Sequence, residues 1–310
     1  MADLLRDART TLLLRALELL GKRRRRVLGW RALAGTGVAD ITFESQGLSW
    51  TASPDDGPVG FALFVDGAYH GAELAALCSW MAHGGVVSAT RDVVVDVGAH
   101  IGSTCIPLAR ATGCRVLAIE PVAASFRRLT ANVAQNALAE RIRLAHAAVR
   151  RQGGRVTMSL VPGASGSSFV SGTEPGRRAP DALQVEEVDA RPLGDLLAAA
   201  GFRPEEVALV WADVQGCEAE VIASGTALWA RGVPLWAEIE PRSLRQQGGV
   251  AEFVRRAGEH FDRFIEAQDL VRHGAAARPV PIAALTALIE SIGPELNRDA
   301  LFLPPGRQPG

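Results

Sequence analysis

Short apolar runs recur along most of this chain, and segments with helical spacing of apolar residues separate them. The runs that predict buried strands are residues 92–97, 115–120, 142–147, 208–213 and 234–240. The intervening segments predict helices near 102–112 and 122–137, and helices that start near Pro192 and Glu218. Strands that alternate with helices in this way favour an α/β fold with a right-handed, mostly parallel sheet.

The second half of the chain departs from this regular order. Residues 153–180 are rich in Gly, Ser, Pro and Arg, which predicts a flexible excursion of a length that is often functional. The order resumes with a short strand at 185–188. After a helix near 249–260, segments 261–268 and 300–303 are predicted to pair as an antiparallel edge.

The first 85 residues have a different pattern and predict a small cap in front of a core domain at 86–310. Segments 41–43 and 48–50 flank a glycine-containing turn, and 54–58 form a strong loop signal. Apolar residues at helical spacing then predict a helix over 73–81 that ends before Gly84.

An apolar stretch at 12–20 precedes five consecutive cations at 22–26, which is the reverse of the order in a secretory signal. Two interpretations of this N-terminal segment stay open. It predicts either an amphipathic helix that ends in a basic cluster and docks weakly on anionic lipid or on a partner, or a helix packed on the domain with cations near its C-terminus. No segment is long and apolar enough to span a bilayer.

Composition narrows the class of protein. The 310 residues are 48% hydrophobic and 22% charged with a net charge of −1, which fits a globular enzyme and gives no reason to expect a nucleic-acid partner. The four cysteines, at 78, 105, 114 and 217, are scattered, which argues against a zinc site or a disulfide framework and fits a cytoplasmic location. Homo-oligomerisation stays open.

The loop after the first predicted strand carries the most specific chemistry. Gly98 and Gly102 permit a tight turn, but His100 stands where a dinucleotide fingerprint has its middle glycine. Asp96 lies at the end of the strand, where it would repel a pyrophosphate. Glu120 ends the next strand, and its carboxylate can accept both hydroxyls of a ribose. Together these residues indicate a cofactor without phosphate, which favours S-adenosylmethionine over NAD.

Carboxylates end four of the predicted core strands: Asp96, Glu120, Asp213 and Glu240. In an open parallel sheet, ligands bind outside the carboxyl ends of the strands. We therefore expect these four side chains to line one cleft.

These motifs together resemble the FkbM family of class I S-adenosylmethionine-dependent methyltransferases. The resemblance rests on five ordered motifs and covers roughly residues 60 to 305. The motifs are Val95-Asp96-Val97-Gly98-Ala99-His100-Ile101-Gly102, Ala118-Ile119-Glu120-Pro121, Ala147-Ala148-Val149, Trp211-Ala212-Asp213-Val214-Gln215-Gly216-Cys217-Glu218 and Glu238-Ile239-Glu240-Pro241. It implies a Rossmann-like fold whose mostly parallel sheet has seven strands with an antiparallel last strand, preceded by the helical and β-containing N-terminal extension.

The resemblance also implies roles for individual residues. Asp96, Gly98 and Gly102 would hold the methionine part of the cofactor, Glu120 the ribose, and Ala147 and Ala148 would border the adenine. Two positions depart from the usual family pattern. His100 stands where the family usually has Asn, so an imidazole would replace an amide contact to the cofactor, and Gln215 stands where Glu is commoner.

The family implies methyl transfer to a hydroxyl of a sugar or secondary metabolite, which needs a base. Asp213 is the first candidate and Glu240 the second. His146 has a better pKa for a base, although its apolar strand predicts a buried, satisfied histidine. Ser167 and Ser168 are candidate substrate contacts, but surface polarity explains them equally well. Clustered acids can bind Mg²⁺, so metal dependence stays open, although no spacing of residues calls for a metal. N-methylation, a cofactor-binding scaffold without turnover and an NAD-dependent oxidoreductase are the alternatives.

Overall fold

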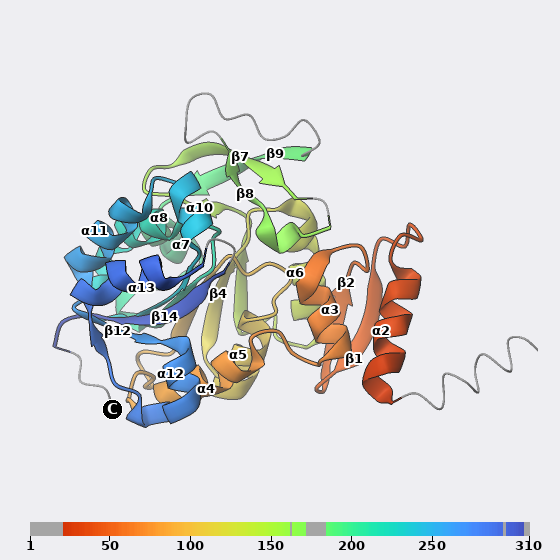
Figure 1. The fold of residues 1–310 in the computed structure, drawn as a ribbon, viewed down its shortest axis with the longest axis horizontal. Coiled ribbons are helices and arrows are strands. Elements are labelled where there is room, and N and C mark those ends of the chain that lie inside the picture. The colour runs from red at the N-terminus through yellow and green to blue at the C-terminus, as the bar shows by residue number, and fades with distance from the viewer. Residues whose placement is uncertain (1–20, 162, 172–183, 294–295, 307–310) are drawn as a thin grey trace, which may run out of the picture. The chain divides into compact units, whose positions relative to one another are not determined.

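A computed structural model describes residues 21–161, 163–171, 184–293 and 296–306 (Figure 1). The chain divides into two compact units, Met1–Tyr69 and His70–Gly310. This division comes earlier than the sequence-based one at residue 85. The helix between the two points, α4 (Gly71–His83), contacts α5 (Cys105–Thr112) and α12 (Ala267–His273), so it belongs with the second unit.

From residue 21 on, the first unit contains one hairpin and two helices. Its described elements are α2 (Lys22–Leu33), β1 (Ile41–Ser45), β2 (Leu48–Ala52) and α3 (Gly57–Val65). The antiparallel pair β1 and β2 confirms the predicted strands, and both turn residues, Gln46 and Gly47, have the positive φ that a tight hairpin needs. Trp30 of α2 packs on Phe61 and Phe64 of α3, which closes a small core.

The basic cluster at 22–26 does not end a described helix, as the sequence had suggested, but begins one. α2 starts at Lys22, and Gly21 before it has extended backbone angles. Glycine destabilises the interior of a helix because it loses much conformational entropy there, but it is well tolerated at the residue just before a helix. The cations therefore occupy the first turns of α2. The apolar stretch at 12–20 lies outside the described residues.

The second unit is built on one large sheet. Its strands are β3 (Val93–Val97), β4 (Arg115–Ile119), β5 (Ile142–Ala145), β10 (Val207–Ala212), β11 (Leu235–Ile239), β12 (Arg263–Glu266), β13 (Val280–Pro281) and β14 (Arg298–Leu303). The spatial order is β13-β12-β14-β11-β10-β3-β4-β5. Pairing is parallel from β11 to β5 and antiparallel where β14 meets β11 and β12. The structure thus confirms the predicted α/β fold, with the two-residue β13 added to the seven expected strands.

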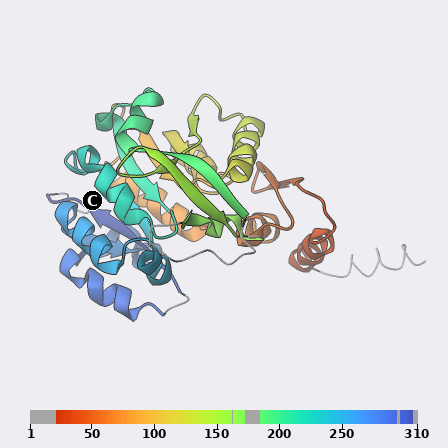
Figure 2. The same ribbon diagram turned by 90° about the horizontal axis from the view of Figure 1, so that it is seen from above.

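Helices connect these strands and cover the sheet (Figures 1 and 2). The helices not yet given are α6 (Ala123–Gln135), α7 (Leu193–Ala199), α8 (Glu218–Ser224), α9 (Thr226–Trp229), α10 (Pro241–Gln246), α11 (Val250–His260) and α13 (Leu285–Ser291). Side chains from α7, α8, α11 and α13 form one apolar core with Val93, Val95 and Val97 of β3. Because side chains alternate along a strand, Asp96 points to the opposite face.

A smaller sheet corrects two predictions from the sequence. It has the order β6-β9-β7-β8, with β6 (Ala148–Val149), β7 (Gly154–Leu160), β8 (Phe169–Ser171) and β9 (Gln184–Arg191), and Figure 2 shows β7 and β9 in green. The segment at 153–180 is therefore not wholly a flexible excursion, and the strand at 185–188 is not part of the main sheet. The alternating Val156 and Met158 pack against Val170 and Val188, which the Gly- and Ser-rich composition had obscured.

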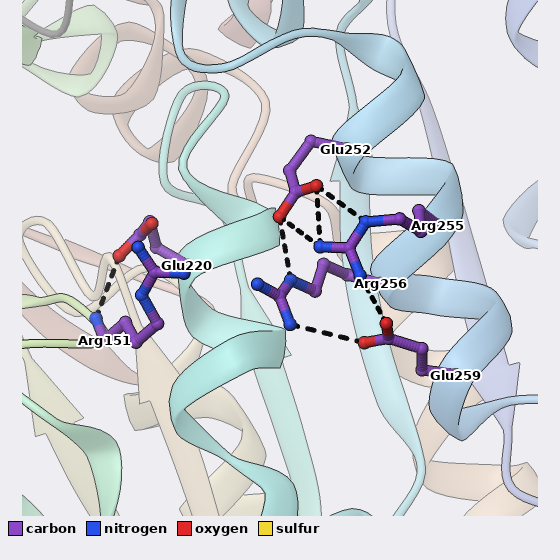
Figure 3. Close-up of polar contacts among 6 residues, drawn as sticks. All are labelled: Arg151, Glu220, Glu252, Arg255, Arg256 and Glu259. Atoms are coloured by element: carbon purple, nitrogen blue, oxygen red, sulfur yellow. Dashed lines mark hydrogen bonds and ion pairs between the residues drawn. The ribbon is translucent and has the colours of Figure 1, made fainter.

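The outer face of α11 carries an ion-pair network (Figure 3). Arg255 and Arg256 both pair with Glu252 and Glu259, one helical turn away. Such exposed pairs contribute little to stability, because water and salt screen them, so the burial of Phe253 on the other face contributes more to holding α11 in place. Within the described part of the chain, no helix combines the length and the apolar character needed to cross a membrane.

Candidate active site at the carboxyl ends of the parallel strands

The turn after β3 is shaped by three residues with positive φ: Gly98 at 87°, His100 at 51° and Gly102 at 94°. The backbone N–H groups of Gly98 and Ala99 donate to the carbonyl of Ile119, which ties the turn to the end of β4. A Cβ on Gly98 would lie 1.9 Å from the backbone oxygen of Asp213. Gly98 is thus required for the close packing of two strand ends, in addition to any approach of a ligand.

Glu120 is held by the backbone of this turn. Its Oε2 accepts the N–H of His100 at 2.8 Å, and its Oε1 accepts the N–H of Val122 at 2.8 Å. Burial raises the pKa of Glu120 to about 7, although the two backbone donors oppose this effect. Each oxygen keeps a second lone pair, so the carboxyl group can still accept hydrogen bonds from a ligand.

Asp96 is a buried acid with few polar contacts. Its side chain is 1% exposed, and neither carboxyl oxygen has a partner in strict hydrogen-bond geometry, although the thiol and the backbone N–H of Cys105 face it. Burial, followed by the neighbouring Asp213 carboxylate, raises the pKa of Asp96 to about 7, and Cys105 offsets this only in part. A buried carboxyl group without a cationic partner is costly, which indicates a site prepared for a donor or cation that arrives with a ligand.

Asp213 follows β10 and belongs to a second group of acids. Its Oδ1 accepts the amide N–H of Gln215 at 3.1 Å, and the same amide nitrogen donates to Oε2 of Glu238 at 2.9 Å. Asn297 donates to Oε1 of Glu238. Burial and then the Asp213 and Glu218 carboxyl groups raise the pKa of Glu238 well above its ordinary value, while Asn297 lowers it.

Asp299 extends this group onto β14. It stands opposite Glu238 in the antiparallel register of β11 and β14, and its Oδ2 lies 3.7 Å from Nδ1 of His70. Burial, then Asp213 and Glu73, raises the pKa of Asp299 to about 7. Trp211 of β10 and Trp236 of β11 stack on each other with ring centroids 4.8 Å apart.

Sequence analysis missed Glu238, Asp299 and Asn297. The missed signal for the first was alternation: in the buried strand β11, Trp236 and Glu238 share the face opposite to Leu235, Ala237 and Ile239, which belong to the apolar core. Position 240 was preferred because it ends the apolar run. The family resemblance includes the stretch from Asn297 to Phe302, but it gave Asn297 and Asp299 no role, because the antiparallel insertion of β14 beside β11 is what brings them into place.

Glu240 and His146 lie apart from these acids. Glu240 precedes α10, where its carboxylate accepts the hydroxyl of Ser243. His146 is exposed rather than buried in a strand as expected, because β5 ends at Ala145. Its Nε2 lies 2.9 Å from the carbonyl oxygen of Pro121, and its ring stacks on Phe126.

The remaining predicted site residues have structural contacts. Ala147 is buried, and Ala148 is in β6, paired with Ala190 of β9. Ser167 is exposed in a short 3₁₀ helix, and the Ser168 hydroxyl accepts the N–H of Val161 at 3.4 Å. The serine that reaches the glycine turn is instead Ser165, whose hydroxyl lies 2.6 Å from Nε2 of His100. Glu218, at the start of α8, accepts the N–H groups of Val214 and Gly216.

The carboxyl ends of β3, β4, β10 and β11 therefore bring together three of the four predicted acids: Asp96, Glu120 and Asp213. The acids at these strand ends are coupled electrostatically. The Asp213 carboxylate raises the pKa of each of the buried ones: Asp96, Glu120, Glu238 and Asp299. Within the described ranges no group of three or more potential ligands is arranged to hold a metal ion. This arrangement suits an organic cation and a group that gives up a proton.

The chain was compared with curated protein sequences and with solved structures. No curated protein sequence matches significantly. Similar solved structures include TYW2 of P. horikoshii (12% identity, 91% of this chain and 81% of that chain, TM-score 0.43). A geranyl diphosphate methyltransferase is also similar (12% identity, 80% of this chain and 91% of that chain, TM-score 0.42). So is the O-methyltransferase TomG of Streptomyces achromogenes (12% identity, 76% of this chain and 79% of that chain, TM-score 0.37). Similarity at this level is too low to inform on activity.

The sequence profile of the Methyltransferase FkbM domain matches residues 96–268. The match begins at Asp96, includes Glu120, Asp213 and Glu238, and spans more than half of the chain. The chain belongs to the FkbM family of methyltransferases.

Proposed function

We propose that this protein transfers a methyl group from S-adenosylmethionine to a hydroxyl group of a sugar or secondary metabolite. The observation that carries the proposal is Asp96, a fully buried carboxyl group beside the Asp213 carboxylate that no cation among the described residues pairs with. S-adenosylmethionine carries a sulfonium and an ammonium but no phosphate, so its charges complement a site of this sign. A dinucleotide would bring phosphates to the same acids.

The residues at the glycine turn fit this cofactor. Asp96 would accept from the ammonium group, and Glu120 would accept from the ribose hydroxyls with the lone pairs that its two backbone donors leave. Gly98 keeps the turn free of a side chain beside Asp213. The bordering of adenine by Ala147 and Ala148 stays a prediction.

When bound, S-adenosylmethionine supplies a methyl group on a good leaving group, so the protein has to align the acceptor and receive its proton. Asp213 is the base in this proposal, since it follows β10 at the centre of the acidic group and is partly exposed. A carboxylate takes a hydroxyl proton only as the new carbon–oxygen bond forms, because the pKa values lie far apart. Glu240 and His146 hold other contacts, which makes them weaker candidates.

Calorimetric titration with S-adenosylmethionine, S-adenosylhomocysteine and NAD⁺ tests the cofactor. We expect micromolar binding of the first two and none of the third, with at least a tenfold loss in Glu120→Ala. Glu240→Ala, which lies outside the glycine turn, is the matched control and should bind normally. Absence of binding to either sulfur compound, or preference for NAD⁺, would reject the proposal.

Asp213→Asn separates methylation of a hydroxyl from methylation of an amine that reacts as the free base. With a hydroxyl acceptor, the loss of the base should lower kcat by roughly 10² or more while S-adenosylmethionine still binds. An unchanged kcat would favour N-methylation. Normal binding with no product from any hydroxyl compound would favour a scaffold without turnover.

A further inference from the structure

We propose that Asp213 and Glu238 form a carboxyl pair that shares one proton, and that Gln215 and Asn297 are the positioning residues that hold it. The pair itself is a property of the protein without ligand. The part of the inference that rests on the proposed function is that a hydroxyl acceptor later gives the pair a second proton.

The geometry begins with one amide group. The Nε2 of Gln215 has two hydrogens, and it lies 3.1 Å from Oδ1 of Asp213 and 2.9 Å from Oε2 of Glu238. A single NH₂ group therefore bridges two carboxyl groups, and Asn297 donates to the remaining oxygen of Glu238. The backbone of Gln215 has a φ of 52°. The next residue is Gly216, and a Cβ added to it would lie 2.3 Å from the carbonyl oxygen of Ser243, so the chain passes close to Ser243 at this point.

The surroundings supply no strong positive charge to separate the two carboxyl groups. Acids face the pair from β3, α8 and β14, namely Asp96, Glu218 and Asp299, and Glu73 of α4 acts on Asp299 in turn. Across the described ranges no arginine or lysine forms an ion pair with any of these acids, and the only basic partner is His70, beside Asp299. Two close carboxylates in such surroundings cannot both ionise, so one retains a proton.

Glu238 is the member that keeps the proton. It is 8% exposed, whereas Asp213 is half-buried and next to the glycine turn. Burial and the Asp213 carboxylate both raise the pKa of Glu238. Asp213 is left as the carboxylate that meets an acceptor.

This pair gives position 215 a defined role. In the proposed reaction the acceptor oxygen bonds to the methyl carbon, the carbon–sulfur bond breaks, and the hydroxyl proton passes to Asp213. The pair then changes from one proton to two, and the thioether leaves without charge. Glutamate at position 215, the commoner residue in the family, would add a third acid that needs its own proton, whereas glutamine bridges the two acids without charge.

Thermal melting from pH 5 to 9 without ligand tests the pair. Glu238→Gln imitates the protonated side chain, and Gln215→Glu adds a third acid. A raised pKa in the folded state means that stability is complete at low pH and falls as pH rises above the ordinary value of the group. We therefore expect the Tm of the wild type to fall below that of Glu238→Gln by several degrees as the pH rises.

The other variants make the result specific. Gln215→Glu should lose stability with pH more steeply than the wild type, and Glu240→Gln, the control, should follow the wild type. Parallel curves for the wild type and Glu238→Gln would overturn the pair. That comparison stands even if Gln215→Glu fails to fold.

Titration with S-adenosylmethionine separates this inference from the proposed function. Binding to Glu238→Gln should stay within a few-fold of the wild type. If the wild type does not bind the cofactor but the melting curves diverge, the proposed function fails and the pair stands. With an acceptor in hand, Gln215→Glu should move the acid limb of the kcat profile to higher pH, because an added negative charge favours the protonated form of the acidic group as a whole.

Helix α2 independently carries an inference about an interaction surface. We infer that its exposed face binds a membrane surface that contains anionic lipids. Lys22, Arg24, Arg25 and Arg31 are exposed, and among the described residues no ion pair involves them. Arg23 and Arg26, by contrast, are used within the unit, by Asp66 and by the carbonyl of Phe64.

The face also carries an apolar residue. Leu28 is 45% exposed and follows Arg24 and Arg25 by one helical turn, so cations surround a side chain that prefers to leave water. A lipid surface satisfies both features at once, because phosphate and serine headgroups attract the cations while Leu28 enters the interface. A folded acidic partner would satisfy only the charges.

Co-sedimentation of the full chain with vesicles tests this surface. We expect binding to phosphatidylcholine vesicles that contain phosphatidylserine, and little binding to phosphatidylcholine alone. Arg24→Glu/Arg25→Glu should weaken binding roughly 30-fold or more. The matched control is Arg127→Glu/Arg143→Glu, which reverses two exposed cations of the second unit. Equal loss in both variants, equal binding to both vesicles, or no binding would overturn the inference.

Discussion

Two adjacent regions of the main sheet hold buried carboxyl groups by different means. At the ends of β3 and β4, both oxygens of Glu120 accept backbone N–H groups. At the ends of β10 and β11, both oxygens of Glu238 accept side-chain amides, from Gln215 and Asn297. Backbone N–H donors are present whichever residues form the loop, provided that the loop keeps its conformation. Amide donors require Gln or Asn at particular positions of distant segments. The first arrangement is therefore robust to substitution, and the second depends on residue identity.

The largest expected effect comes from the contact that joins the two regions. Gly98→Ala places a Cβ 1.9 Å from the carbonyl oxygen of Asp213 and leaves alanine at a φ of 87°. Because backbone cannot move aside cheaply, we expect a loss of roughly 4 kcal/mol or more in the free energy of unfolding, or no folded protein. Urea denaturation measures it.

Gly113→Ala is the matched control for this substitution. Its φ is 73°, but the nearest atom to a new Cβ is the flexible Nη1 of Arg141 at 3.8 Å. A loss of only about 1 kcal/mol is expected from the backbone strain alone. Equal losses at the two glycines would show that the contact with Asp213 is unimportant.

Asp96→Asn sharpens the comparison through pH. The pKa of Asp96 rises from 3.8 to about 7 on folding. Below pH 4 the carboxyl group is protonated in both states and takes nothing from the stability, but between pH 4 and 7 it ionises only in the unfolded chain, so the free energy of unfolding falls as the pH rises. At pH 8 the variant should be more stable than the wild type by up to about 4 kcal/mol, and the gain should vanish at pH 4. Asp195→Asn, at an exposed position, should show no such gain.

The same variant should lose affinity for S-adenosylmethionine if Asp96 receives its positive charge. In the wild type this affinity should strengthen as the pH rises from 6 to 8 and Asp96 ionises. A gain in stability together with unchanged binding would place the cofactor elsewhere.

The smallest effect compares one donor from each region. Val122→Pro removes the backbone donor to Glu120 at a residue whose φ of −80° a proline tolerates, and Asn297→Ala removes the amide donor to Glu238. Each should lower the free energy of unfolding by about 1–3 kcal/mol, because a buried acceptor loses its partner. Asn297→Ala should also raise the pKa of Glu238, and Val122→Pro that of Glu120, because each donor lowers the pKa of the acid it contacts. The pH dependence of melting detects both changes, and a change in only one variant would mean that the two kinds of donor are not equivalent.

The same contrast explains what the sequence could predict. The strands of the main sheet, the turn at Gly98 and the acids at 96, 120 and 213 follow from local patterns, since an apolar run, a glycine and a strand-end acid lie within a few residues. Glu238 was within reach by its alternation with Trp236. Asp299 and Asn297 were not, because their role depends on where β14 enters the sheet.

Two other errors have similar causes. Strand β7 was predicted as a flexible segment because Gly and Ser dominate its surroundings, although Val156 and Met158 alternate correctly for a strand. His146 was predicted to be buried because one residue of error in the end of β5 moves a side chain to another environment.

The position of β14 has a consequence for how the protein is made. Among the described strands β14 comes last in the chain, yet it lies between β11 and β12. During synthesis on the ribosome, β11 therefore waits as an open edge until β14 has emerged. Activity should therefore appear only after β14 has joined the sheet. A nascent chain that stalls before β14 should bind chaperones, because the edge of β11 is exposed.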